Sequence, residues 1–278
     1  MAVWLPLMAG LLVTFTGTYW NLWNTAWQSE DQAHGPLILA IVLWLFWQLR
    51  DKLLRVFPSP NKVIGWPLLA VGLASFVVGR SQDLLLLDVG SQILLLGALL
   101  LLFLGNKSIK ISWFPLLYMI FMIPVPGIIV DALTGPLKQY ISIIAESVLY
   151  ALGYPIGRQG VVLHIGQYQL LVADACSGLH SMFSLSALGL LYMYLSRRQS
   201  LLHNGIMLAS ILPIAFVANV VRVMILILVT YYFGDEAGQG FLHGTAGIVL
   251  LLAALMFLFL IDWAMSLAFR TSRRGHSA

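Results

Sequence analysis

Three side chains in this sequence have the types that acyl transfer between peptide groups requires. Cys176 offers a thiol, Arg222 a permanent cation, and His243 an imidazole that exchanges protons near neutral pH. Together they could supply a thiolate nucleophile, a fixed positive charge for the oxyanion and a general acid and base. Because Cys176 is the only cysteine, an intrachain disulfide is excluded. The alternative to a reactive thiol is a buried, inert small side chain.

The cysteine lies in the segment Asp174-Ala-Cys-Ser-Gly178, directly before an apolar run. A thiol at a helix N-terminus meets the positive end of the helix dipole and unpaired N–H groups, which favour the thiolate. The carboxylate of Asp174 opposes this effect unless it caps the helix.

The arginine lies in Ala218-Asn219-Val-Val-Arg222, inside an apolar run at 205–232. An arginine in hydrocarbon costs at least about 2.5–3.5 kcal/mol, so a compensating interaction or a function is expected. Counted from Gly205 at 1.5 Å per residue, Arg222 lies roughly 26 Å up a core of about 30 Å, just below the outer surface. The alternative is an ion pair with Asp88, which lies near the same surface in another span.

Two further histidines compete for the role of His243, which begins the last apolar run. His180 follows Cys176 by four residues and therefore shares its helical face. His34 precedes Gly35 and Pro36 at the start of another span, where it could line the same cavity or cap that helix. His203 is expected on the opposite, inner side of the membrane, and Asp262, near the inner end of the last span, is expected to be structural.

The composition determines the kind of element that holds these residues. Hydrophobic residues make up 60% of the 278 residues and charged residues 9%, with a mean hydropathy of +0.91. These values exclude a soluble enzyme, a disordered chain and a nucleic-acid-binding protein. We expect an all-α polytopic membrane protein in one domain, residues 1–278, with about eight transmembrane helices. The apolar runs lie at 3–20, 36–49, 63–79, 84–104, 111–130, 177–195, 205–232 and 245–266.

The basic residues indicate how these spans are oriented. Three of them, Arg80, Lys138 and Arg158, are expected outside, and Arg222 lies within a span. The positive-inside rule therefore places both termini in the cytoplasm and the candidate residues at the outer face. Trp20, Trp23 and Trp27 mark the outer interface. The eleven basic residues expected inside are Arg50, Lys52, Arg55, Lys62, Lys107, Lys110, Arg197, Arg198, Arg270, Arg273 and Arg274.

The external segment 131–176 is too long for a simple connection. Its apolar residues recur with helical spacing, which predicts an amphipathic helix on or in the outer leaflet, ended by Gly153 and Pro155. Residues 161–172 then predict a small hairpin that turns near Gly166. The helix is expected to bury Leu137, Tyr140, Ile141, Ile144, Ala145, Val148 and Leu149, and to expose Lys138, Gln139, Ser142, Glu146 and Ser147.

The sequence resembles the exosortase family of Gram-negative bacteria in several short motifs. These are the segment from Asp174 to Gly178, the segment from Ala218 to Arg222, and His243-Gly244. The Val- and Leu-rich hairpin and the His34-Gly35 pair also resemble this family. The resemblance extends from about residue 20 to 265. The residues that we expect in supporting roles beside the three candidates are Asp174, Ser177, Gly178, His180, Asn219, His34 and Asp88.

The resemblance implies a membrane cysteine transpeptidase of the bacterial inner membrane, with Cys176 as nucleophile, Arg222 as oxyanion stabiliser and His243 as acid and base at the periplasmic face. Its implied partners are exported proteins with a C-terminal Pro-Glu-Pro motif, transmembrane helix and basic tail, and an acceptor that the sequence does not identify. Membrane lipids are expected partners and nucleic acid is not. The residue spacings indicate no metal, cofactor or phosphate-binding loop.

Two other functions compete with this interpretation. A transporter would use Arg222, Asp88 and His243 to line a polar pathway. An enzyme of lipid-linked exopolysaccharide assembly would use Arg222 and Asp88 as a polar site. It would also place several arginines and acids in its long external loop, where 131–176 has only Lys138 and Arg158 as cations.

Overall fold

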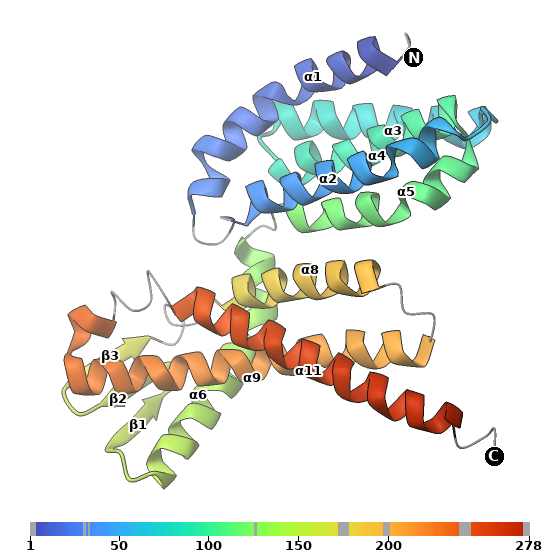
Figure 1. Cartoon of the computed structure of the whole chain (residues 1–278). Coiled ribbons are helices and arrows are strands. Elements are labelled where there is room, and N and C mark those ends of the chain that lie inside the picture. Colours follow the sequence, from blue (N-terminus) through green and yellow to red (C-terminus); the bar gives the residue numbers. More distant parts are fainter. Residues whose placement is uncertain are drawn as a thin grey trace. The chain divides into compact units, whose positions relative to one another are not determined.

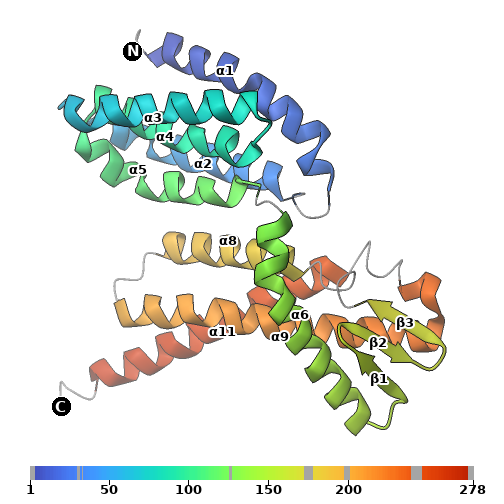
Figure 2. The same ribbon diagram turned by 180° about the vertical axis from the view of Figure 1, so that it is seen from behind.

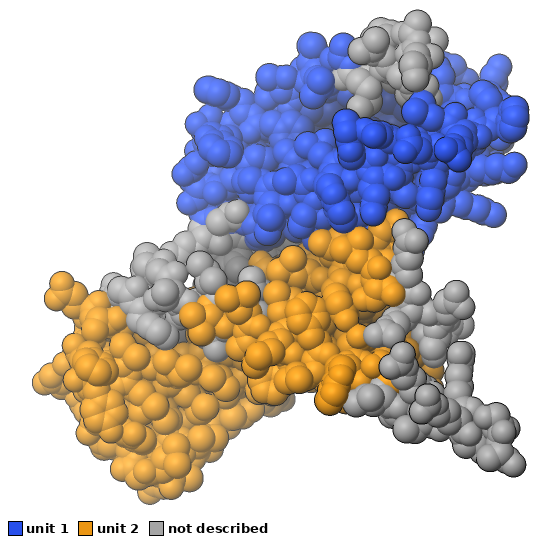
Figure 3. All heavy atoms as spheres, in the orientation of Figure 1, with its two compact units in different colours: residues 1–127 blue, residues 128–278 orange. Residues whose placement is uncertain are grey.

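The computed structural model describes residues 4–29, 32, 34–124, 127–171, 178–196, 201–238 and 246–274. The described chain is mostly helical, with one small sheet, and it divides into two compact units. Unit 1 comprises Met1–Gly127 and unit 2 comprises Ile128–Ala278 (Figure 3). The expectation that residues 1–278 act as one domain stays a prediction.

Unit 1 consists of helices that run side by side (Figure 1). They are α1 (Trp4–Asn24), α2 (Gly35–Leu54), α3 (Lys62–Ser81), α4 (Leu85–Phe103) and α5 (Asn106–Tyr118), with short 3-10 helices at Ala26–Gln28 and Met119–Met122. The closest pair is α3 and α4, because buried glycines recur every seven residues along α3. A Cβ on Gly65, Gly72 or Gly79 would lie 2.7, 2.9 or 2.4 Å from an atom of α4. Small residues at such a seam let two helix backbones approach closely.

The apolar run 111–130, predicted as one span, is not one continuous helix. Helix α5 already ends at Tyr118, a single 3-10 turn follows, and a new helix starts at Gly127. Hydropathy alone misses this break, because a break between two helices need not interrupt an apolar run. Pro124 disfavours helical geometry at the preceding residue, and Ile123 is extended accordingly, with φ −73° and ψ 120°.

Unit 2 combines long helices with a small sheet (Figure 2). Helix α6 (Gly127–Ala151) precedes strands β1 (Ile156–Gln159), β2 (Val162–Ile165) and β3 (Tyr168–Leu171), and then come α8 (Gly178–Ser196), α9 (Leu201–Phe233) and α11 (Ala246–Arg274). The sheet is antiparallel in the order β1-β2-β3. The predicted hairpin that turns near Gly166 is therefore confirmed as β2 and β3, and the sequence analysis missed β1.

Glycines set the turns around this sheet. Gly160 and Gly166 begin its two two-residue loops with φ of +65° and +56°, as type II′ hairpin turns require. Gly153 has φ +90° and ends α6 as predicted: its N–H donates to the carbonyl of Tyr150, and the N–H of Tyr154 donates to that of Leu149. This pair of bonds is a Schellman motif.

The predicted amphipathic face of α6 is partly wrong. Ile141, Ala145 and Leu149 are buried as expected, but they pack against the sheet and α9. Tyr140, expected on this face, is 63% exposed, whereas Ser142, expected on the polar face, is fully buried. The buried stripe is narrow: it consists of residues four apart, including Ile141, Ala145 and Leu149, which contact the sheet and α9.

Among the described residues, three helices are long and apolar enough to cross a bilayer: α3, α4 and α9 from Leu202 onward. Two shorter apolar stretches lie in α8 and α11, at Phe183–Ser196 and Leu252–Ser266. The chain is therefore a helical membrane protein, and the expected number of eight spans stays a prediction.

Candidate functional site

Several predicted site residues lie outside the described part of the chain. These are Asp174, Cys176, Ser177 and His243. Gly178 is described as the first residue of α8, and His180 follows in the first turn of that helix. Arg222, Asn219, Asp88 and His34 are described with their side chains, so the site can be built from the helices on which these residues lie.

Helix α9 is divided by its packing into two parts, and Arg222 lies where they meet. The first part packs on α8 and α11 through Met207, Ile211 and Ala215. The second packs on α6 and the sheet through buried Val220, Val223, Leu226 and Ile227. At 1.5 Å per residue, a helix of 33 residues is about 50 Å long, which exceeds a hydrocarbon core of about 30 Å. Such a helix can cross the bilayer and continue beyond it.

The contacts of α8, α9 and α11 fix their relative register. Leu185, Ala215 and Ala254 form one buried cluster. A Cβ on Gly189 of α8 would touch Ile211 of α9 and Leu258 of α11. Residue numbers fall along α9 as they rise along α8 and α11, so α9 is antiparallel to both, as Figures 1 and 2 show.

This register gives the level of Arg222. A step of seven residues, about two turns, leads from Ala215 to Arg222 along α9. The same step leads from Leu185 to Gly178 along α8 and from Ala254 to Gly247 along α11. Arg222 is therefore level with the N-terminal ends of α8 and α11.

The side chain of Arg222 is only 7% exposed, and that of Asn219, one turn earlier on the same helix, is 2% exposed. Residues three apart lie on one helical face, so the cation and the amide are neighbours. Two helix N-termini at this level add the partial positive charge of the helix dipole. The arrangement is suited to binding an anion or to stabilising negative charge that develops in a reaction.

The end of α9 turns the chain back toward this level. Gly234 has φ +91° and follows Phe233 as the left-handed residue that ends the helix. A helical turn at 235–238 comes next, and Gly238 lies so close to Thr230 that a Cβ would stand 2.2 Å from the threonine Oγ1. Thr230 is two turns beyond Arg222, so the described chain passes beside α9 shortly before α11 begins.

The other two described candidates, His34 and Asp88, belong to unit 1. His34 occupies the N-cap position of α2, but its side chain makes no capping hydrogen bond. Asp88 is 2% exposed, and its carboxylate accepts from Thr18 Oγ1 at 2.8 Å and pairs with Arg80 Nη1 at 3.4 Å. Asp88 thus has polar partners within unit 1, and its expected ion pair with Arg222 stays a prediction. Arg80 and Asp88 meet because Arg80 lies in the last turn of α3 and Asp88 in the first turn of α4, across the connecting turn.

A buried polar cluster that was not predicted from the sequence lies at the opposite end of α8, α9 and α11. His203 Nε2 lies 2.6 Å from Asp262 Oδ1, and Tyr192 Oη donates to Asp262 Oδ2 at 2.8 Å. Asp262 and His203 were expected on the same side of the membrane, and this shared side was the one available signal of the contact. The cluster lies about 30 Å along α9 from Arg222, counted at 1.5 Å per residue.

Comparison with known proteins adds to this geometry. Neither the curated proteins nor the solved structures gave a match. The family model described as transmembrane exosortase matches residues 23–260, a range that covers most of both units and includes every candidate residue from His34 to His243. Since this match covers most of the chain, the protein belongs to the transmembrane exosortase family.

Proposed function

We propose that this protein is a membrane cysteine transpeptidase that cleaves the C-terminal sorting signal of exported proteins through a thioester at Cys176. Membership of the exosortase family supports a protease or transpeptidase function in the membrane. The observation that carries the assignment of residues is the register of unit 2. It brings Arg222 level with the first residues of α8 and α11, the two helices that directly follow Cys176 and His243 in the sequence.

Chain connectivity limits how far the proposed nucleophile can lie from this level. Cys176 precedes Gly178 by two residues, and consecutive Cα atoms are about 3.8 Å apart, so its Cα lies within about 8 Å of the start of α8. His243 precedes Ala246 by three residues, which corresponds to about 11 Å. Both distances are compatible with a site at the level of Arg222.

In the proposed reaction, a substrate presents the peptide bond beside its Pro-Glu-Pro motif, with its transmembrane helix docked against the spans. The Cys176 thiolate attacks the carbonyl carbon, and Arg222 stabilises the oxyanion. His243 donates a proton to the leaving amine as the C–N bond breaks, which leaves an acyl thioester on Cys176. An acceptor nucleophile then gives its proton to His243 and displaces the thiolate. His180, four residues after Cys176, is the alternative proton carrier.

The proposed setting is the inner membrane of a Gram-negative bacterium, with eight spans, both termini in the cytoplasm and the site at the periplasmic face. The antiparallel course of α9 against α8 and α11 supports this, because it puts the starts of α8 and α11 and the Arg222 level of α9 at one end. No resident metal or organic cofactor takes part in the proposed steps.

The test uses co-expression of the full chain with an exported protein that carries the sorting signal. Cys176→Ala and Cys176→Ser should abolish processing, seen as retention of the larger precursor on a gel. Ser147→Ala is a matched control, since Ser147 is exposed on α6 and donates only to the carbonyl of Ile143 four residues before it. Normal processing in either Cys176 variant would overturn the proposal.

A second measurement tests the state of the thiol in the unmodified protein. Because Cys176 is the only cysteine, a membrane-impermeant maleimide can react nowhere else. Labelling from the periplasmic side, and its loss on addition of a sorting-signal peptide, is the expected result. Labelling from the cytoplasmic side alone would contradict the proposed location.

A further inference from the structure

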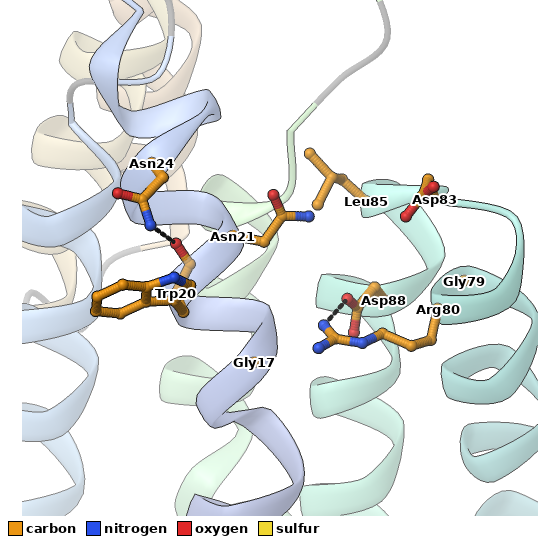
Figure 4. A pocket seen from close by; sticks show the side chains of 9 residues that line it. All are labelled: Gly17, Trp20, Asn21, Asn24, Gly79, Arg80, Asp83, Leu85 and Asp88. Carbon is orange, nitrogen blue, oxygen red and sulfur yellow. Dashed lines mark hydrogen bonds and ion pairs between the residues drawn. The ribbon is translucent and has the colours of Figure 1, made fainter.

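Unit 1 contains a polar cavity of about 490 Å³ where α1 and α3 end and α4 begins (Figure 4). Its size falls in the range of about 300–1,000 Å³ that small-molecule sites occupy. The polar side chains that line it are Asn21, Asn24, Arg80, Asp83 and Asp88. None of these residues has a role in the reaction proposed above for Cys176, Arg222 and His243.

The cation of this cavity is held in a fixed place. Asp88 is buried and accepts from Thr18 Oγ1 and Arg80 Nη1, whereas the side chain of Arg80 remains 45% exposed. The guanidinium also lies against Gly17, where a Cβ would stand 2.0 Å from Arg80 Nη2. One edge of the guanidinium is therefore tied to Asp88, and its remaining N–H groups are available to a ligand, with the Asn21 amide on the facing helix (Figure 4).

A second charge of the opposite sign lines the same cavity. Asp83 is exposed in the turn between α3 and α4, and in the described part of the chain it makes no ion pair. Its φ of +52° is left-handed, a backbone geometry that aspartate and asparagine tolerate better than most residues. Since Asp88 balances Arg80, the carboxylate of Asp83 gives the cavity a net negative charge.

The cavity lies at the level of a membrane–water interface. Helices α3 and α4 both qualify as membrane spans, and the cavity opens where they join. Trp20 and Trp23, in the last turns of α1, are 72% and 54% exposed. Exposed tryptophans at helix ends are typical of the headgroup layer, where their amphipathic rings are stable.

From this combination we propose that the cavity binds the headgroup of a zwitterionic phospholipid with a primary ammonium, phosphatidylethanolamine. Arg80 and the Asn21 amide donate to its phosphate, and the ammonium donates to the carboxylate of Asp83. An anionic headgroup such as phosphatidylglycerol leaves Asp83 unmatched beside a negative ligand. Phosphatidylcholine has no N–H to donate to that carboxylate.

The experiment measures retained lipid and needs no catalysis, so its outcome is independent of the transpeptidase proposal. The purified full chain is equilibrated with equal amounts of phosphatidylethanolamine, phosphatidylglycerol and phosphatidylcholine of one acyl composition, and bound lipid is identified by native mass spectrometry. We expect phosphatidylethanolamine to be enriched about fivefold, the effect of roughly one charge at a membrane surface. Equal retention of the three lipids would overturn the proposal.

Two variants test the residues, each with a matched control. Asp83→Asn keeps a residue that tolerates positive φ and should remove most of the enrichment, whereas Asp51→Asn, at an exposed ion pair on α2, should not. Gly17→Ala should displace the guanidinium and weaken retention, whereas Gly10→Ala on the same helix meets open space. Enrichment that survives in both Asp83→Asn and Gly17→Ala would contradict the site.

Two competitors identify the source of the ligand. Soluble glycerophosphoethanolamine, which lacks acyl chains, should leave the bound phosphatidylethanolamine in place. Displacement by this compound would assign the cavity to a water-soluble ligand, and displacement by an equimolar sorting-signal peptide would assign it to the substrate. Either result would overturn the assignment to a lipid.

Discussion

The helices α8, α9 and α11 carry polar groups at both ends of their shared interface, and the two ends differ in the signs they bring together. At one end, His203 and Tyr192 each contact the carboxylate of Asp262, at 2.6 and 2.8 Å, and the three residues come from three helices. At the other end, the cation of Arg222 is level with the N-termini of α8 and α11, where helix dipoles have their positive ends. The first arrangement binds its own complementary groups and serves stability. The second concentrates positive potential and is suited to negative charge that a substrate brings or develops.

The largest effect that tests this comparison is expected at the end where Arg222 lies, on the rate of cleavage. His243→Ala should lower the single-turnover rate of sorting-signal cleavage by about 10²–10⁴, the usual contribution of a general acid and base. His180→Ala should leave the rate nearly unchanged. A large loss in His180→Ala together with a small one in His243→Ala would assign the proton transfer to His180.

A substitution at the opposite end should lower the stability of the protein and leave the cleavage rate unchanged. Asp262→Ala leaves the His203 ring and the Tyr192 hydroxyl without the carboxylate that binds both, so unfolding in detergent should become easier by about 3–5 kcal/mol. Asp51→Ala is the control, because the exposed pair of Asp51 with Arg50 at 3.7 Å contributes little. Cleavage per folded molecule should stay unchanged in both. A loss of rate in Asp262→Ala at normal stability would contradict the assigned roles.

The local elements of this fold were predictable from sequence because local signals determine them. The bounds of α3 and α4 follow from apolar runs, the end of α6 from Gly153, and the turn of β2 into β3 from Gly166. Strand β1 was missed because its four residues, Ile-Gly-Arg-Gln, carry little β-forming signal on their own.

The contacts between elements were harder to predict from the sequence. Asp88 pairs with Arg80 because α3 and α4 approach closely through their glycine seam, and that seam is a property of two helices together. Likewise, the contact of His203 with Asp262 depends on the register of α9 against α11. Within the candidate site, the sequence suggested that the depth of Arg222 matches the starts of the last two predicted helices. The contacts among α8, α9 and α11 now support this match in depth.

A smaller effect is expected for the arginine itself. Arg222→Gln should lower the rate of thioester formation by about 10²–10³, as the loss of one oxyanion-stabilising donor does. Arg158→Gln is the matched control in the same unit, since its guanidinium binds Glu146 at 2.9 Å, beside the sheet. Unfolding measured in detergent should change less in Arg222→Gln than in Asp262→Ala. The opposite order, with a normal rate, would make Arg222 a structural residue and remove the difference between the two ends.

The smallest effect should come from the hydroxyl of Tyr192. Tyr192→Phe removes one hydrogen bond of 2.8 Å to Asp262 and should cost about 0.6–1 kcal/mol, the range for such bonds between helices in membranes. Tyr150→Phe, at a tyrosine that is 71% exposed on α6, should cost nothing measurable. In an Asp262→Ala background the acceptor is already absent, so Tyr192→Phe should then have no further effect. If the two costs simply add, the hydroxyl does not act through Asp262, and the three-helix cluster does not stabilise this end as one unit.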